Sequence, residues 1–550
     1  MKKVLIPLVA SVSLLASNYR IVPLSSDGVA LSGSNLAKSF GADAAFLNPA
    51  NMAFLQARPQ VHFALNYYGI RGSKFINELH EVNGKRYYNA EDANGRNYAV
   101  ALPVFAFVYP VNEKHFLGAA AYTDFAALYG WDSDYASSLA NNMNIRGGTV
   151  ALSYAYRPIS ELSLGVALTA NHTKLKFDLI KDNVKNPAYP RPALPNEPTW
   201  TDDEGKTHPY FWAYDGKAET DNGLKLGYKL SLTYAPSYFD EKLRFSAFYN
   251  SSYENDFKGD MHFKLSKWDM FDFAGKVIKA NTQTGSPADL LNPQMIGLGL
   301  GYATLGVEMA QAAVNNALYD LPIKYDGSIS ANFLYPASIN LGVAYELGKH
   351  EFMLNVGRTF WSKNEKLNLK VDTPKTPNKL QTGVIEAIGK IQQALPTCSV
   401  NDTCKTEVNK ILAGIAMTMT PEEKQEIQEY FLAEILNQSL EQKWKDTTLI
   451  SLGYRYNYDE KWSFMGGFAT EDSPVSRQRI SFLAKDSRIY MYSLGCEYRY
   501  SSNFTINTGA MYQQYADVSV HDVDNELLWT SGHFKDQKNY IFNLGFNYIF

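Results

Sequence analysis

The sequence predicts an all-β protein, a transmembrane antiparallel β-barrel of about 14 strands with an N-terminal plug and a helical extracellular insertion. Three observations lead to this fold class. Many segments alternate between apolar and polar residues, short polar connections alternate with long ones, and the chain ends on an aromatic residue, Phe550. A period of two is that of a β-strand with two unlike faces, which suits a wall between lipid and a polar interior.

Composition supports this fold class. The chain has 550 residues, 45% of them hydrophobic, and a mean hydropathy of −0.27. No apolar run reaches the length of a membrane-spanning helix, whereas barrel strands hide their apolar half in alternation. The 37 Tyr and 30 Phe suit the aromatic girdles of such barrels. The formal net charge of −4 provides no basic surface, so we expect no nucleic-acid partner.

The N-terminus has the features of an export signal. Lys2 and Lys3 precede an apolar run from Val4 to Ala16, and small residues follow, so residues 1–17 are predicted to be a signal peptide. Residues 18–56 come next, rich in Ser, Gly and Ala and without alternation. They precede the first strand, so we expect them at the periplasmic mouth, where a compact segment can fold inward as a plug.

Residues 57–550 carry the barrel pattern. Even-numbered residues from Leu224 to Tyr234 are large and apolar, and those between are polar or glycine. Six short connections are expected in the periplasm and seven long ones outside, which gives both chain ends a periplasmic position. The short ones lie near 111–114, 158–161, 236–241, 347–350, 458–461 and 501–503, and the long ones near 71–96, 126–146, 178–221, 257–325, 372–443, 471–486 and 520–535.

Two long insertions interrupt the strands. Residues 372–443 switch to helical spacing and contain a helix start at Thr420-Pro421, so we expect a helical extracellular insertion. Cys398 and Cys404 within it suggest a local disulfide, with two free thiols as the alternative. Residues 266–325 form an unusually apolar extracellular loop, which either collects an apolar ligand or packs against the helical insertion.

Chemistry-bearing motifs are absent. The sequence contains no Gly-x-Ser-x-Gly, His-Glu-x-x-His or Walker loop, and its nine His lack metal-ligand spacing. We therefore expect no enzymatic activity, no metal and no cofactor. Inward charges such as Lys225, Lys229, Arg455 and Glu497 either line a pore or pair across a filled barrel, and pairing is the more common arrangement.

The closing strand is the most regular element. From Asn539 to Phe550, every second residue is large and apolar or aromatic, and Asn or Gly dominates the other face. The apolar face consists of Tyr540, Phe542, Leu544, Phe546, Tyr548 and Phe550. A C-terminal Phe is common in outer-membrane barrels, and we expect the barrel-assembly machinery to recognise the chain through Phe550.

At this point the sequence resembles a known family. The segment Ser25-Ser26-Asp27-Gly28, the approach Gly41-Ala42-Asp43-Ala44 and the triplet Asn48-Pro49-Ala50 look like the N-terminal hatch of FadL-type outer-membrane transporters. The stretch 129–158, the strand start 334–342 and Trp361-Ser362 resemble further parts of that family. The resemblance covers the barrel and the hatch but not the two insertions.

The resemblance implies a mechanism. Family members bind long-chain fatty acids and other hydrophobic compounds inside a 14-stranded barrel filled by the hatch, which shifts while a kink in the third strand opens the wall sideways. Any lateral gate is then expected on the third strand at Gly118, Ala119, Ala120 and Ala121, although small residues there could simply pack against the plug. The candidate ligand contacts are Phe40, Phe46, Leu47 and Phe54, and Asn48, Pro49 and Ala50 are expected to hold the hatch geometry.

These expectations define a function and two rivals. We expect a monomeric channel in the outer membrane of a Gram-negative bacterium, in contact with membrane lipid and lipopolysaccharide, that admits a hydrophobic small molecule passively. The first rival is a water-filled porin for polar solutes. The second is a surface adhesin or binding protein that uses the helical insertion.

Overall fold

The computed structural model describes most of the barrel and the N-terminal segment. The described residues are 25–78, 92–123, 125–132, 142–180, 214–265, 323–372, 438–482, 485–521 and 531–550, with a few short pieces between them. The predicted signal peptide 1–17, the pair Cys398 and Cys404, and nearly all of the predicted insertions 266–325 and 372–443 lie outside these residues.

The barrel wall is a single antiparallel sheet of 19 strands. At five places around the barrel two consecutive strands together span the wall, so 14 wall-spanning units, here called staves, surround the interior. The first seven staves are β1 (Gln60–Arg71), β6 (Tyr98–Pro110), β7 (His115–Tyr122) with β8 (Ala126–Gly130), β9 (Asn142–Ile159), β10 (Leu162–Ile180), β13 (Tyr214–Tyr234), and β14 (Leu243–Asn250) with β15 (Tyr253–Leu265). The next four are β16 (Ile323–Tyr335) with β17 (Ser338–Leu347), β18 (His350–Thr359) with β19 (Lys366–Val371), β20 (Gln438–Glu441) with β21 (Thr447–Asn457), and β22 (Trp462–Glu471). The last three are β23 (Ile489–Arg499), β24 (Phe504–Tyr515) and β27 (Lys538–Ile549).

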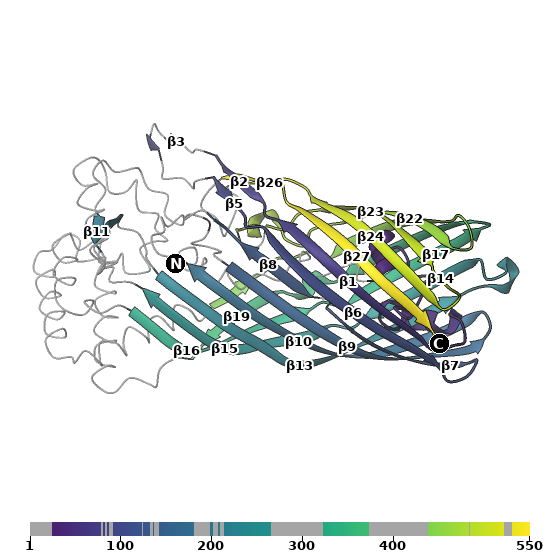
Figure 1. Ribbon diagram of the computed structural model, residues 1–550. Coiled ribbons are helices and arrows are strands. Elements are labelled where there is room, and N and C mark those ends of the chain that lie inside the picture. Colours follow the sequence, from purple (N-terminus) through teal and green to yellow (C-terminus); the bar gives the residue numbers. More distant parts are fainter. Residues whose placement is uncertain are drawn as a thin grey trace, which may run out of the picture.

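The barrel closes between its first and last staves. β1 and β27 pair without interruption from Gln60 opposite Ile549 to Arg71 opposite Lys538. Figure 1 shows β27 lying beside β1 along its length, with both strands tilted like their neighbours. Closure leaves neither strand with a free edge, which is what a membrane-spanning sheet requires.

Side-chain burial follows the two-residue period. In β27 the predicted lipid-facing residues such as Phe542 and Leu544 are exposed, whereas Ile541, Asn543 and Gly545 are buried. The same division holds in β13, where Leu226 and Leu230 are exposed and Lys229 is buried. The outer surface is therefore an apolar band, and the prediction of a barrel of about 14 strands is confirmed.

The six predicted short connections are confirmed as the links between consecutive staves at one end of the barrel. Several strands extend further into the predicted long loops than the alternation indicated: β10 runs to Ile180 and β13 starts at Tyr214. Beyond the membrane both sheet faces can be polar, so hydrogen-bonded strands continue there without an apolar face to reveal them.

Smaller elements complete the described structure. At the long-loop end lie β2 (Lys74–Asn77), β3 (Glu81–Val82), β4 (Lys85–Arg86), β5 (Ala93–Asn94), β11 (Thr199–Thr201), β12 (Thr207–Pro209), β25 (Val518–Val520) and β26 (Gly532–Lys535). The short helices η3 (Ser237–Phe239) and η8 (Arg477–Arg479) connect staves, and η7 (Trp361–Lys363) lies between β18 and β19 within one stave. Within the described residues, no helix is long and apolar enough to span a membrane.

The N-terminal segment, residues 25–55, contains three short helices: α2 (Ser26–Ala30), α3 (Ala44–Leu47) and η2 (Pro49–Phe54). The starts of α2 and η2 have a sequence cause. The Ser25 side chain accepts from the N–H of Gly28 at 3.0 Å, and the Asn48 side chain accepts from the N–H of Ala50 at 3.1 Å ahead of Pro49. Nearly every residue of this segment is buried, because it lies against inward-facing residues of the staves.

Candidate functional site

The third stave is broken by a bulge. β7 ends at Tyr122 opposite Thr149, and β8 begins at Ala126 opposite Arg146, so between these pairs the third stave has one residue more than β9, which has Gly147 and Gly148. One extra residue on one strand is the definition of a β-bulge, which bends the strand that carries it. The N–H of Gly147 donates to the carbonyl of Phe125 at 2.8 Å and holds the bulge to β9.

On its other side, the bent stave separates from β6. The pairing of β6 with β7 covers Phe105 to Pro110, and no backbone pairing with β8 is found for residues 98–104 of the described chain. The two staves meet again toward the long-loop end of the barrel, where the N–H of Arg96 donates to the carbonyl of Gly130 at 2.8 Å. The hydrogen-bond ladder of the wall thus has a gap between residues 98–104 of β6 and β8, which is called the opening below.

Pro103 lies at the middle of the β6 edge of this opening. The N–H of Val111 donates to the carbonyl of His115 at 2.8 Å, so its amide points toward the third stave. Backbone amides alternate sides along a strand, and β6 pairs with β1 in continuous register, so position 103 points its amide the same way. A proline has no N–H, and the edge therefore lacks a donor where no partner strand is present.

Phe125 fixes the bulge from inside the barrel. Its side chain is 2% exposed and packs against the rings of Phe333 and Tyr335, with centroids 6.4 and 5.8 Å away. These two residues belong to β16, on the far side of the interior from β6. The bent stave is therefore drawn inward by an aromatic cluster, not left without support.

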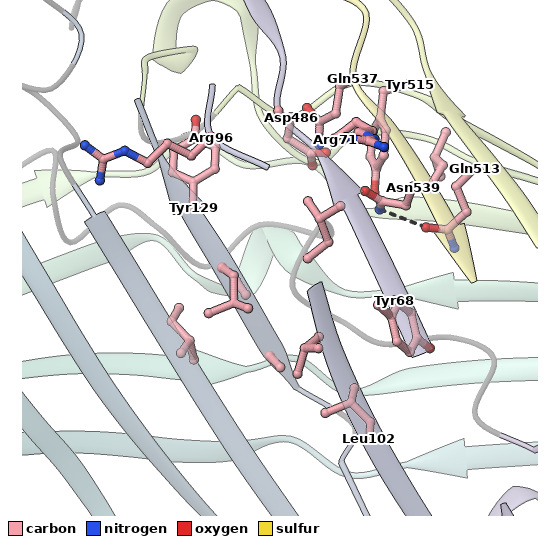
Figure 2. A pocket seen from close by; sticks show the side chains of 18 of the residues that line it. Tyr68, Arg71, Arg96, Leu102, Tyr129, Asp486, Gln513, Tyr515, Gln537 and Asn539 are labelled. Atoms are coloured by element: carbon pink, nitrogen blue, oxygen red, sulfur yellow. Dashed lines mark hydrogen bonds between the residues drawn. The ribbon is translucent and has the colours of Figure 1, made fainter. Parts of the chain in front are cut away.

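A pocket of about 390 Å³ lies behind the opening. This is within the usual size of a small-molecule site. Figure 2 shows Leu102 and Tyr68 at one end and Arg71, Asp486, Gln537 and Tyr515 at the other, with the hydrogen bond between Asn539 and Gln513 between them. Its lining includes Tyr68, Ile70, Val100, Ala101, Leu102, Ala126, Ala127, Leu128, Tyr129, Ile145, Lys485, Ile489, Met491 and Gln513.

The pocket is amphipathic. Toward the short-turn end its walls are apolar, with Leu102 and Met491 in one buried cluster. Toward the long-loop end it carries three arginines and Lys485, together with the carboxylates of Glu471 and Asp486. The Lys485 ammonium lies over the rings of Tyr129 and Trp131, 4.9 and 4.8 Å from their centroids. Burial lowers the pKa of Lys485 well below the usual range of a lysine.

The inward row of β13 holds the N-terminal segment. The Lys229 ammonium donates to the carbonyl of Phe46 at 3.1 Å, and the Ser231 hydroxyl accepts from the N–H of Ala50 at 3.0 Å. Thr233 donates to the side-chain oxygen of Asn51 at 2.7 Å. Three successive inward residues of one stave thus contact residues 46–51.

Asn48 is the most connected residue of the predicted hatch triplet. Its side-chain N–H₂ lies 2.8 Å from the carbonyl of Leu36 and 3.2 Å from the hydroxyls of Thr233 and Ser246. Its side-chain oxygen accepts from Ala50, so both ends of the amide are used. The residue ties the segment to itself and to two staves at once.

The four predicted ligand contacts lie away from the pocket described above. Phe46 is buried and stacks on Tyr122, with centroids 4.9 Å apart, and Leu47 packs beside it. Phe40 lies under the Arg455 guanidinium at 4.2 Å. Phe54 lies between two guanidiniums, those of Arg157 at 4.6 Å and Arg244 at 5.0 Å. None of the four lines this pocket.

The predicted gate residues Gly118 to Ala121 are paired with both neighbouring staves. Gly118 and Ala120 face inward, and a Cβ added at Gly118 would come 2.9 Å from the Cβ of Ala45. Small residues here let the N-terminal segment approach the wall closely, as inward Gly545 does beside Ser26. The opening begins beyond them, at the bulge.

Inward charges are paired. The guanidinium of Arg455 lies 2.8 Å from the carboxylate of Glu497, and the ammonium of Lys38 lies 2.7 Å from that of Glu351. Lys225 pairs with Asp256 at 2.7 Å. Pairing is therefore the arrangement found for these charges, whereas the Lys229 ammonium donates to the carbonyl of Phe46 and the hydroxyl of Tyr122. The described residues contain no cluster suited to a metal ion.

The residues that form the opening were not among the sequence candidates. A Pro inside the predicted second strand and the doublet Gly147-Gly148 in the fourth are the signals that could have indicated them, since both disfavour a regular ladder. Lys485 gives no such signal, because it lies in an irregular connection between β22 and β23.

Comparisons with known proteins agree with this fold. A family model described as outer membrane protein transport protein (OMPP1/FadL/TodX) matches residues 8–550. The long-chain fatty acid transport protein of Escherichia coli (strain K12) is 29% identical over 107 residues, which are 20% of this chain and 23% of that protein. The match thus spans about a quarter of the curated relative.

Solved structures share the fold. A Pseudomonas aeruginosa FadL homologue superposes with a TM-score of 0.63 at 16% identity, covering 97% of this chain and 100% of the other. The Pseudomonas putida toluene transporter TodX gives a TM-score of 0.51 at 13% identity, covering 93% and 95%. At these identities the likeness extends to the fold alone.

Proposed function

Since the chain belongs to the OMPP1/FadL/TodX family of outer membrane transport proteins, we propose that it is a passive channel that takes up long-chain fatty acids and releases them sideways through its wall. The membership places the chain in the outer membrane as a channel for hydrophobic compounds. The substrate and the route are the proposed parts.

The observation that carries the proposal is the continuity between pocket and opening. Val100 to Leu102 of β6 and Ala126 to Gly130 of β8 form both the edges of the opening and part of the pocket lining. A molecule in the pocket therefore lies next to a gap in the ladder. An apolar molecule that leaves by this gap enters the hydrocarbon layer without crossing water, and no energy source is needed.

The pocket chemistry favours a fatty acid over an apolar hydrocarbon. A buried ammonium at one end and an apolar wall at the other match a carboxylate on an alkyl chain. A bound carboxylate would give Lys485 a counter-ion that a hydrocarbon such as toluene cannot supply. The name of the E. coli relative supports the same choice.

In this proposal residues 25–55 act as the hatch. They lie against inward residues of many staves, from Gly165 of β10 to Gly545 of β27. Phe46 and Leu47 would meet ligand only after this segment shifts, and the Asn48 hydrogen bonds would hold the resting position. Phe40 and Phe54 are covered by guanidiniums at rest, so we propose the same conditional role for them.

The porin rival fits the interior poorly. The N-terminal segment fills the short-turn half of the barrel, and inward residues such as Phe257, Phe333 and Leu369 make the other half apolar. An aqueous pore needs a polar lumen. A wide, steady ionic conductance of the wild-type protein in a planar bilayer would overturn the proposal.

The decisive experiment measures oleate uptake against pH. Cells that produce the protein should take up radiolabelled oleate faster than cells without it. Lys485→Met should weaken oleate binding to the purified protein about tenfold, the effect of losing one charge-assisted bond. Because the lowered pKa leaves Lys485 uncharged at a lower pH than an ordinary lysine, wild-type affinity should fall as pH rises through that range.

Two controls sharpen this test. The methyl ester of oleate has no carboxylate, so its binding should change little with pH or with Lys485→Met. The variant Lys461→Met removes a lysine from an exposed short turn and should bind oleate like the wild type. Equal loss for oleate and its ester would remove Lys485 from substrate recognition.

A further inference from the structure

The bulge of the third stave and the N-terminal segment are joined by one side chain. The Lys229 ammonium donates to the hydroxyl of Tyr122 at 2.7 Å and to the carbonyl of Phe46 at 3.1 Å. Tyr122 is the last residue of β7 before the bulge, and Phe46 belongs to α3. The two partners also touch each other, since their rings stack with centroids 4.9 Å apart.

Lys229 differs in this respect from its neighbours on β13. The inward residues Ser231 and Thr233 also bond the N-terminal segment, and Thr233 bonds Ser246 of the adjacent stave as well. Neither reaches β7. Of the three contacts on this row, only that of Lys229 extends from the N-terminal segment to the stave that borders the opening.

Burial makes the bridge sensitive to displacement. Lys229 is 8% exposed, and its ammonium lies 4.9 Å from the ring centroid of Tyr122 and 5.8 Å from that of Phe248. A buried cation that loses an oxygen acceptor pays a desolvation cost that water does not repay. When Phe46 moves, the Lys229 ammonium therefore either follows the carbonyl of Phe46 or binds the hydroxyl of Tyr122 more strongly. Each change alters the force that Lys229 exerts on the end of β7.

We propose that Lys229 is a positioning residue that couples displacement of the N-terminal segment to the width of the wall opening. The inference rests on the proposed channel function and adds the link between its two moving parts. Lys229 does not need to touch the transported molecule. Its role is to make the opening respond to the segment, so that the wall widens only when the segment has shifted.

The test separates binding, coupling and transport. Lys229→Met keeps the length of the side chain and removes the ammonium, and Tyr122→Phe removes the acceptor while it keeps the stack with Phe46. Lys225→Met is the matched control, because Lys225 lies on the same inward row and pairs with Asp256 instead. Oleate uptake in cells and oleate binding to purified protein are measured for each variant, at equal surface levels and with normal heat-modifiable mobility.

The coupling itself is read by spin labels. Cysteines at Ala99 and Leu128, in a background without the native cysteines, place one label on each side of the opening. Oleate should shift the distance between them in the wild type and in Lys225→Met. In Lys229→Met the shift should be absent, with uptake lowered about tenfold and binding within about twofold, a size typical of coupling between sites. Lys229→Arg should restore part of the shift.

Two results would overturn the coupling role. One is an unchanged oleate-induced shift in Lys229→Met, and the other is a parallel loss of binding and uptake, which would mark Lys229 as a ligand contact or a packing residue. Failure of the channel function looks different: wild-type cells themselves would then take up oleate no faster than cells without the protein.

Discussion

Two junctions between neighbouring staves, here called seams, flank the β1–β6 pair, and they differ in how completely their strands are paired. On one side, β1 pairs with β27 along its whole length, from Gln60 to Arg71. On the other side, β6 pairs with the third stave only from Phe105 to Pro110, although the strand continues to Tyr98. Both seams face the same membrane, so the bilayer does not decide which one is complete.

The difference lies in three local features. The open seam has one extra residue between Tyr122 and Ala126, a proline whose missing N–H faces the gap, and Phe125 drawn inward by β16. The closed seam has none of these in its twelve-residue strands. An opening in a barrel wall therefore needs no missing strand, since here it coincides with one extra residue, one absent donor and one inward anchor.

Removal of the extra residue should have the largest effect. Deletion of Thr123 leaves two residues opposite Gly147 and Gly148, so β7 and β8 can form one continuous strand with unchanged register beyond Ala126. The open seam then resembles the closed one, and oleate uptake should fall by about tenfold or more, which corresponds to at least about 1.4 kcal/mol of added barrier.

The control for the Thr123 deletion is a deletion in the short turn of another hairpin. Loss of Ser502 from the short turn after β23 should leave uptake unchanged when surface levels are equal. Wild-type uptake by the Thr123 deletion, in a barrel shown to be folded, would mean that the opening is not the exit.

Loss of the inward anchor should have a smaller effect. Phe125→Ala removes the packing on Phe333 and Tyr335, so the bent stave can relax toward β6. We expect uptake to fall a few fold, and stability to drop by about 3 kcal/mol, as for other buried Phe to Ala changes. Urea unfolding in detergent measures the second quantity, and Phe125→Leu should preserve most of it. Faster uptake in Phe125→Ala would show that the cluster restrains the opening instead of holding it.

The smallest effect is expected from restoring the missing donor. Pro103→Ala supplies an N–H toward the gap but no partner to receive it, so uptake should change by less than about twofold, the scale of one weak hydrogen bond. In combination with the Thr123 deletion, however, the new N–H gains an acceptor. The double variant should therefore be more resistant to heat than the deletion alone, and equal resistance would exclude a role for residue 103 in the seam.

The sequence predicts the barrel wall of this protein more completely than the opening in that wall. Alternation in residues 539–550 and the six short turns come from local patterns, which one chain displays by itself. The bulge is different, because the extra residue between Tyr122 and Ala126 is recognised only when the third stave is aligned with Gly147 and Gly148 of β9. Register between strands is a property of pairs, and no single strand reveals it.

The role predicted for Asn48, which is to hold the hatch geometry, stays a prediction. Its side chain has partners on the segment itself and on β13 and β14. Phe40 and Phe54 were chosen as ligand contacts for their size, but Arg455, Arg157 and Arg244 cover their rings at rest. Those arginines are distant in sequence, so the choice could not allow for them.

The closed seam also constrains how the molecule is made. The N–H of Phe550 donates to the carbonyl of Pro59 at 2.9 Å, which joins the last residue of the chain to the entrance of its first strand. Pairing across such a sequence separation is the slowest kind to form, so closure belongs late in assembly. Ser26 lies against Gly545 of that last strand. This contact therefore forms only once the late strand is in place, so the N-terminal segment reaches its final packing no earlier than β27 does.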